Sequence, residues 1–108
     1  MNQDEVAQAY ARLKSMQDNL PKHFEVDRKY VAEYHAILDL LQTASGSNLS
    51  GFRVPDTDIH DEVSGGNTIT GKTYYSGRRV VQRSDLMMKV DGVLGFFTIK
   101  TVGFNPRT

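Results

Sequence analysis

The chain has 108 residues, 39% of them hydrophobic and 24% charged, and its 13 basic residues balance its 13 acidic residues. This length predicts one domain with one hydrophobic core, and the composition is that of a globular protein rather than a disordered one. Zero formal net charge excludes a global attraction to nucleic acid or anionic membranes, and the lack of cysteine excludes disulfides, zinc–thiolate sites and thiol catalysis.

Residues 3–20 are expected to form the first helix. Apolar side chains recur there at the spacing of one helical face, at Val6, Tyr10, Leu13 and Leu20. Two acidic residues near its start suit the positive end of the helix dipole. Pro21 is expected to end the helix, because the residue before a proline is pushed out of helical geometry.

A second helix is expected over residues 27–43, after a short connector over 22–26. Asp27 is a suitable N-cap, and Gly46 is placed to end the helix in left-handed geometry. The apolar face between them comprises Val31, Tyr34, Ile37, Leu38 and Leu41. Because a short link joins the two helices, we expect them to pack antiparallel.

Residues 49–63 are expected to be extended and to cross the helical pair, with Leu49, Phe52 and Val54 docked on it. An acidic segment ends this stretch, with Asp56, Asp58, His60, Asp61 and Glu62. Such side chains are competent ligands for a divalent ion. The calcium-loop spacing is absent, however, so a solvated turn is favoured and no metal site is assigned.

Residues 64–83 are rich in glycine and lack helical periodicity. Within them, the residues from Gly66 to Thr73 resemble the Walker A segment of P-loop nucleotide hydrolases, over eight residues only. The resemblance implies that Lys72 contacts terminal phosphates and that Thr73 holds magnesium. The surrounding sequence opposes it, because no buried strand precedes the segment and Gly77 interrupts any helix after it.

The same segment has a simpler interpretation as a small hairpin or a mobile loop. Residues 68–70 and 73–75 are β-prone triplets, and Gly71-Lys72 between them suits a type II′ turn. These two alternatives remain open from the sequence.

A binding function for this segment is the alternative to a purely structural one. Cations beside stackable rings are typical of sites for nucleotides or single-stranded nucleic acid. The candidate phosphate-binding residues are Gly66, Gly71, Lys72, Thr73, Tyr74, Arg78, Arg79 and Arg83. The competing interpretation pairs the arginines with the acidic residues of 56–62.

The longest apolar run, residues 80–102, fits a third helix over 85–98 or a hairpin turning at Asp91-Gly92. Ser84 or Asp85 is a suitable N-cap for the helix, and apolar residues follow at spacings of three and four. Gly92 and Gly95 oppose a helix, each by about 1 kcal/mol relative to alanine. Helix is favoured, and the glycines are then places where another helix, including one of another subunit, comes close.

Three stretches resemble a group of short uncharacterised prokaryotic helical proteins: YVAEYHAILDLL, SGFRVP and LMMKVDGVLGFF. The resemblance covers residues 30–99 and supports a helix over 85–98. Those relatives often carry Cys-Asp-Arg before their last helix, whereas this chain has Gln82-Arg83-Ser84-Asp85. The resemblance implies no activity.

Together these patterns predict a mainly α single domain over residues 1–108, with three helices and an irregular loop or short β-hairpin between the second and third. No nucleophile–base motif occurs, so no catalytic residue is assigned and an enzyme is not favoured. Neither a secretion signal nor a long apolar span is present, so we expect a soluble cytoplasmic protein without membrane contact or cofactor. The expected function is protein interaction, with a homodimer as the expected assembly; the alternative is nucleotide or nucleic-acid binding through residues 66–83.

Overall fold

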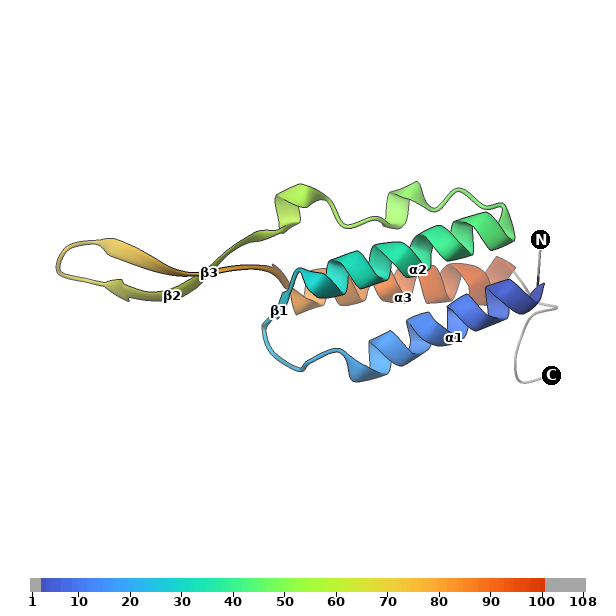
Figure 1. Cartoon of the computed structure of the whole chain (residues 1–108), viewed down its shortest axis with the longest axis horizontal. Helices are drawn as coiled ribbons and strands as arrows, with labels where there is room; N and C mark the ends of the chain where they lie inside the picture. Colours follow the sequence, from blue (N-terminus) through green and yellow to red (C-terminus); the bar gives the residue numbers. More distant parts are fainter. Residues whose placement is uncertain (1–2, 101–108) are drawn as a thin grey trace.

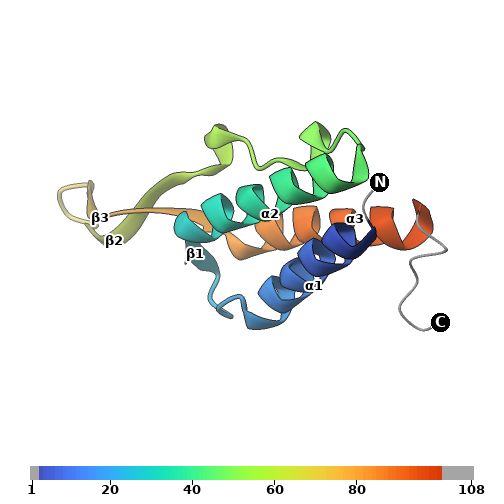
Figure 2. The same cartoon turned by 45° about the vertical axis from the view of Figure 1, so that its right-hand side comes forward.

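Three long helices form the body of the protein in the computed structural model, which describes residues 3–100 (Figure 1). They are α1 (Gln3–Asn19), α2 (Lys29–Ser45) and α3 (Arg83–Lys100). The chain runs back along α1 when it enters α2, so these two helices are antiparallel, and α3 lies beside both (Figures 1 and 2). The mainly α fold class and the helix over 85–98 are therefore confirmed. Two single-turn 3-10 helices follow α2, so the predicted count of three helices is not exact.

The helix ends follow the sequence signals in part. The Gly46 φ angle is 73°, and its amide donates to the Gln42 carbonyl at 2.9 Å, so the glycine ends α2 in left-handed geometry as predicted. Asp27 is not the N-cap, because it lies one residue earlier, although its carboxylate accepts the Lys29 amide hydrogen bond at 2.9 Å. α3 likewise begins at Arg83, before the predicted caps Ser84 and Asp85.

A three-stranded antiparallel sheet joins the helices, in the order β1-β3-β2. Its strands are β1 (Glu25–Asp27), β2 (His60–Asn67) and β3 (Lys72–Gln82). β1 replaces part of the predicted connector over 22–26. β3 runs directly into α3, and the Arg83 amide donates to the Phe24 carbonyl at 2.9 Å, which fixes this junction.

The glycine-rich insertion is a hairpin, longer than the one predicted. Its turn is formed by residues 68–71, so 68–70 are not a strand, and the type II′ turn predicted at Gly71-Lys72 is wrong. Gly71 has a φ of 72° and its amide donates to the Asn67 carbonyl at 2.8 Å. The Asn67 side chain also accepts the amides of Ile69 and Thr70, which explains why the turn forms before the glycine.

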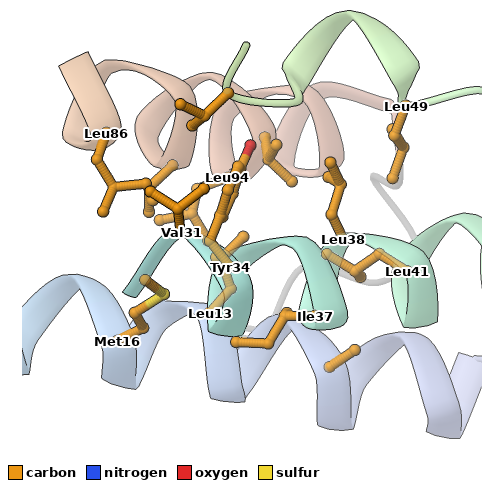
Figure 3. Packing of buried hydrophobic residues seen from close by; sticks show 14 of the residues in the cluster. Leu13, Met16, Val31, Tyr34, Ile37, Leu38, Leu41, Leu49, Leu86 and Leu94 are labelled. Carbon is orange, nitrogen blue, oxygen red and sulfur yellow. The ribbon is translucent and has the colours of Figure 1, made fainter. Parts of the chain in front are cut away.

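The segment between α2 and β2 returns along the helices and closes the core (Figures 1 and 2). It is not fully extended as predicted, because η1 (Ser50–Phe52) and η2 (Asp56–Asp58) lie within it. Leu49 and Val54 are buried, as predicted. Tyr34 points from α2 toward this segment (Figure 3), and its hydroxyl donates to the Phe52 carbonyl at 2.6 Å. Burial raises the pKa of Tyr34 well above its ordinary value, so the donor stays protonated.

The core lies between the three helices and this segment, and side chains from all four meet there (Figure 3). Its largest fully buried side chains are Tyr34, Phe97, Leu13, Ile37, Leu38, Leu41, Leu49 and Leu86. The predicted close approach of another helix at Gly92 is instead taken by a side chain of the same chain. A methyl group at Gly92 would lie 3.1 Å from the Phe52 ring.

The hairpin projects from the body along the direction of α3 (Figures 1 and 2). The molecule measures 61 × 23 × 17 Å. The 18 residues of α3 span about 27 Å and the 11 residues of β3 about 36 Å, so the two placed end to end account for the longest dimension. We call residues 62–78 the arm, since they lie beyond the Asp61–Arg79 pair at the hairpin base.

Candidate functional site

The arm presents two strand edges without a partner. β1 pairs with β3 only from Val80 to Gln82, and its chain then turns into α2. Among residues 3–100, no strand pairs with β3 from Lys72 to Arg79 on the side away from β2, or with the outer side of β2. Such edges carry unpaired amide and carbonyl groups, which makes them templates for another strand.

Large apolar side chains are exposed along the same arm. They are Val63 at 57% exposure, Ile69 at 94%, Tyr74 at 49% and Tyr75 at 58%. Val63 is paired with Tyr75 across the hairpin, whereas Tyr74 is opposite Gly65, which has no side chain to cover it. Nearly every residue of the arm is exposed, so the hairpin buries no face of its own.

Polar interactions hold the base of the arm to the body. The His60 Nε2 atom lies 2.5 Å from the Glu25 carboxylate, which links β2 to β1 across β3. This hydrogen bond raises the pKa of His60 above its ordinary value. Arg78 forms an ion pair with Glu62, and its hydrogen bond lowers the pKa of that carboxyl. The His60–Glu25 contact therefore ties the base of the hairpin to the body, whereas the Arg78–Glu62 pair joins the two strands of the arm.

A cleft of about 420 Å³ lies beside β1 at the base of the arm. It is lined by Pro21, His23, Glu25, Val26, Asp27, Lys29, Tyr30, Glu62 and Arg78. Three carboxylates face two cations there, and one of these cations, Arg78, is already paired with Glu62. The Lys29 ammonium lies 5.3 Å from the centre of the Tyr30 ring. Glu62 is paired with Arg78 and Glu25 with His60, so Asp27 and Lys29 are the remaining carboxylate and ammonium of the cleft wall.

The predicted phosphate-binding residues are spread along the hairpin and are not brought together. Gly66 is opposite Thr73 and Lys72 is opposite Asn67, next to the turn that contains Gly71. A Walker A loop continues into a helix at its lysine, but here the lysine begins a strand of 11 residues. The local geometry is therefore that of a hairpin end and not of a phosphate cradle.

The three arginines of the predicted set have structural partners near the base. Arg78 pairs with Glu62, as the competing interpretation predicted. Arg79 donates to the Ile59 carbonyl at 3.0 Å. Arg83 donates to the Pro21 carbonyl at 2.9 Å. Lys72 and Tyr74, by contrast, are exposed within the arm.

The acidic segment does not converge on one point. Asp56 and Asp58 lie in η2, His60 is hydrogen-bonded to Glu25, and Glu62 is paired with Arg78. Within the described part of the chain, no group of three or more histidine, aspartate or glutamate side chains is placed to hold a metal ion. Of this segment, His60 and Glu62 form contacts at the base of the arm.

Sequence reasoning missed the contribution of β1 to this site. Glu25 and Asp27 come from a three-residue strand, which is too short to show an alternating pattern.

None of the helices among residues 3–100 combines the length and hydropathy of a membrane span. Comparison with protein-family models, with curated proteins and with solved structures returned no match to this chain.

Proposed function

We propose that this protein is a non-enzymatic protein-binding module and that its arm is the docking element. The observation that carries the proposal is the exposure of the arm on both edges together with its four large apolar side chains. A two-stranded hairpin is marginally stable by itself in water, and pairing with a further strand adds backbone hydrogen bonds and covers apolar surface.

Strand addition is the binding mode that fits these features. Main-chain hydrogen bonds along an open edge provide affinity, and side chains at alternate positions provide specificity. Tyr74 and Tyr75 suit the second task, because tyrosine supplies large contact area at low entropic cost and is enriched at protein interfaces. The His60–Glu25 contact ties the base of the hairpin to β1, and the Arg78–Glu62 pair joins the two strands where the arm begins.

Nucleotide or nucleic-acid binding stands as the second candidate, supported by Lys72 beside the exposed Tyr74 and Tyr75. It ranks lower because the three arginines bond to protein groups near the base of the arm. Phosphate recognition draws on several convergent cations and weakens steeply with salt.

Site-specific photo-cross-linking tests the protein-binding role. A benzophenone amino acid at Tyr75, introduced in cells that naturally make the protein, is expected to cross-link to protein. The matched control position is Met88 on α3, which is 70% exposed but lies on the body, and it is expected to give no such product. Equal yields at both positions, or none at Tyr75, would contradict the proposal.

Thermal unfolding distinguishes the second candidate. We expect the Tm to stay unchanged with magnesium nucleotides, cyclic nucleotides and short oligonucleotides. A ligand at about 100 times its Kd would add about 2.7 kcal/mol and raise the midpoint by roughly ten degrees. Such a rise, lost in Lys72→Ala, would establish a phosphate site in the arm and reverse the ranking of the two candidates.

A further inference from the structure

We infer that the partner of the arm is a second copy of this chain, paired through β3 so that each arm tip reaches the cleft at the base of the other arm. This inference rests on the proposed protein-binding role of the arm and names the partner. It joins the two features of the site, the open strand edge and the cleft beside β1, in one assembly.

The β3 edge is better suited to pairing than the β2 edge. β3 carries Thr73, Tyr74 and Tyr75 in sequence, all of which are favoured in strands. β2 carries the Gly65-Gly66 pair in its outer half and acidic residues near its base, and both features disfavour pairing at an edge. Of the two open edges, β3 is therefore the one that another strand would join.

β1 covers only the base of the β3 edge and leaves room for another strand beyond it. β1 is antiparallel to β3 and advances toward the arm tip, but it ends at Asp27, opposite Val80. The Arg28 amide still donates to the Arg79 carbonyl at 3.1 Å, and from Arg78 to Lys72 no strand of residues 3–100 pairs with this edge of β3. A strand placed on this edge would continue the line of β1 along β3.

The β3 strand of a second copy can pair with this open edge through two-fold symmetry. Two identical strands related by a two-fold axis perpendicular to their sheet pair antiparallel, and this generates a closed, isologous interface. The open stretch from Lys72 to Arg78 has its midpoint at Tyr75, so the axis would pass there. The second copy's Lys72 would then lie beside Arg78. Arg78 is two residues from Val80, which pairs with Asp27 of the same chain.

Charge supports this arrangement. Lys72 and Arg78 are the charged residues of the stretch from 72 to 78, and the Arg78 beside which the second copy's Lys72 would lie is already paired with Glu62. Each Lys72 would reach the end of the cleft where Asp27 lies, beside the carboxylates that already pair with His60 and Arg78. Opposite charges placed in this way fix the register of an interface and speed association.

The available area fits a weak, reversible dimer. Tyr74 and Tyr75 lie on the strand that would pair, whereas Val63 lies on β2, behind it. Pairing at the β3 edge would therefore bury less than the roughly 1,000 Å² of a stable specific interface. We expect the dimer to form in a concentration-dependent way.

Sedimentation velocity over a concentration series tests the inference. The wild-type chain is expected to form dimers, and a variant in which the whole arm, residues 62–78, is replaced by Asn-Gly is expected to stay monomeric. Lys72→Glu is expected to raise the dimer Kd at least about tenfold at low salt, because Glu62 already pairs with Arg78 and the new carboxylate would lie near the carboxylates of Glu62 and Asp27. Lys14→Glu, the same charge change on the exposed surface of α1, is the control and should leave the Kd unchanged.

A charge swap tests the register. Asp27→Lys alone is expected to weaken the dimer, and the double variant Lys72→Glu with Asp27→Lys is expected to restore it. Since Asp27 also accepts the Lys29 amide, the Tm of each variant is measured to show that the body is folded. Amide hydrogen exchange gives a second readout without substitution: residues 72–78 should exchange more slowly in the dimer than in dilute solution.

The outcomes separate this inference from the proposed function. A chain that is monomeric up to high concentration, while Tyr75 still cross-links to a different protein, would overturn the second-copy partner and leave the protein-binding role. A dimer that persists without the arm would overturn the inference by placing the interface on the body. A dimer weakened by Lys72→Glu but not restored by the double variant would overturn the contact with Asp27.

Discussion

Gly95 and Gly92 lie three residues apart in α3 and differ in what surrounds them. A methyl group at Gly95 would have nothing within 4 Å, whereas one at Gly92 would press on the Phe52 ring. Gly95→Ala is therefore expected to raise the free energy of unfolding by about 1 kcal/mol, because alanine restricts the unfolded chain and favours the helix. Urea unfolding measures the change.

Gly92→Ala is the control for this prediction and should stabilise less than Gly95→Ala or destabilise, depending on how far the Phe52 ring can move. The pair also tests whether Gly95 permits close contact between subunits. If Gly95→Ala weakened a dimer, α3 would be part of the interface, and the placement of the interface on the arm would be wrong.

His35 gives the protein a pH-dependent contact between α2 and the segment that follows it. Its Nε2 atom accepts the Val54 amide hydrogen bond at 3.0 Å, which requires the neutral ring. Burial, reinforced by Arg53, lowers the pKa of His35 below its ordinary value. This contribution to stability is therefore present above pH about 6.5 and is lost as the pH falls through the folded-state pKa.

We expect the free energy of unfolding to fall less between pH 7.5 and pH 5 in His35→Gln than in wild type, since a glutamine oxygen can accept the same hydrogen bond at either pH. The comparison is needed because His60 acts in the opposite direction. The Glu25 hydrogen bond raises the pKa of His60, so its contribution is present below pH about 6.5 and is lost as the pH rises. Identical pH slopes in both proteins would contradict the role of His35.

The arm and the body are expected to be separable elements. The arm contributes none of the buried core residues, and the Arg78–Glu62 pair lies within it, so removal of the whole arm takes away both partners and costs little. Replacing the whole arm, residues 62–78, by the dipeptide Asn-Gly joins Asp61 to Arg79, which are paired in the hairpin, through a turn that suits a hairpin.

We expect this replacement to change the Tm of the monomer by no more than a few degrees. The measurement is thermal unfolding at a concentration well below the dimer Kd, so that loss of association does not contribute. A large loss of stability would show that the arm supports the core, and loss of binding in that variant could then not be assigned to the docking surface.

The helices could be predicted from the sequence because each buries a regular apolar stripe. Val6, Leu13, Tyr34 and Leu38 are buried as their spacing predicts, and Gly46 ends α2 as predicted. The arm could not be predicted in the same way, because its two exposed faces impose no alternation of apolar and polar residues.

The site was harder to predict than the fold because its parts come from distant positions. Glu25 meets His60, which lies 35 residues further along the chain, and no local pattern reports that pairing. The Walker-like segment was a local pattern without its structural context, and its lysine lies next to a hairpin turn. The resemblance of residues 30–99 to short prokaryotic helical proteins remains a prediction.

At the scale of the whole molecule, the extended arm determines the shape. The radius of gyration is 16.9 Å, whereas a compact chain of this length has about 13 Å. The proposed docking role requires that the arm also projects in solution, because an arm folded back on its own helices would hide the β3 edge and the tyrosines.

Small-angle X-ray scattering on dilute protein is therefore expected to give a radius of gyration near 17 Å for the monomer. In the variant with Asn-Gly in place of residues 62–78, the radius of gyration should approach about 12 Å, the value for a compact chain of about 90 residues. In the proposed dimer the two arms lie side by side, so the second copy adds only the length of its helical body, about 27 Å, to the 61 Å of the first copy. The longest dimension of the dimer should therefore be about 90 Å. A wild-type monomer near 13 Å would show that the arm packs on the body, and strand pairing between copies would then require it to open first.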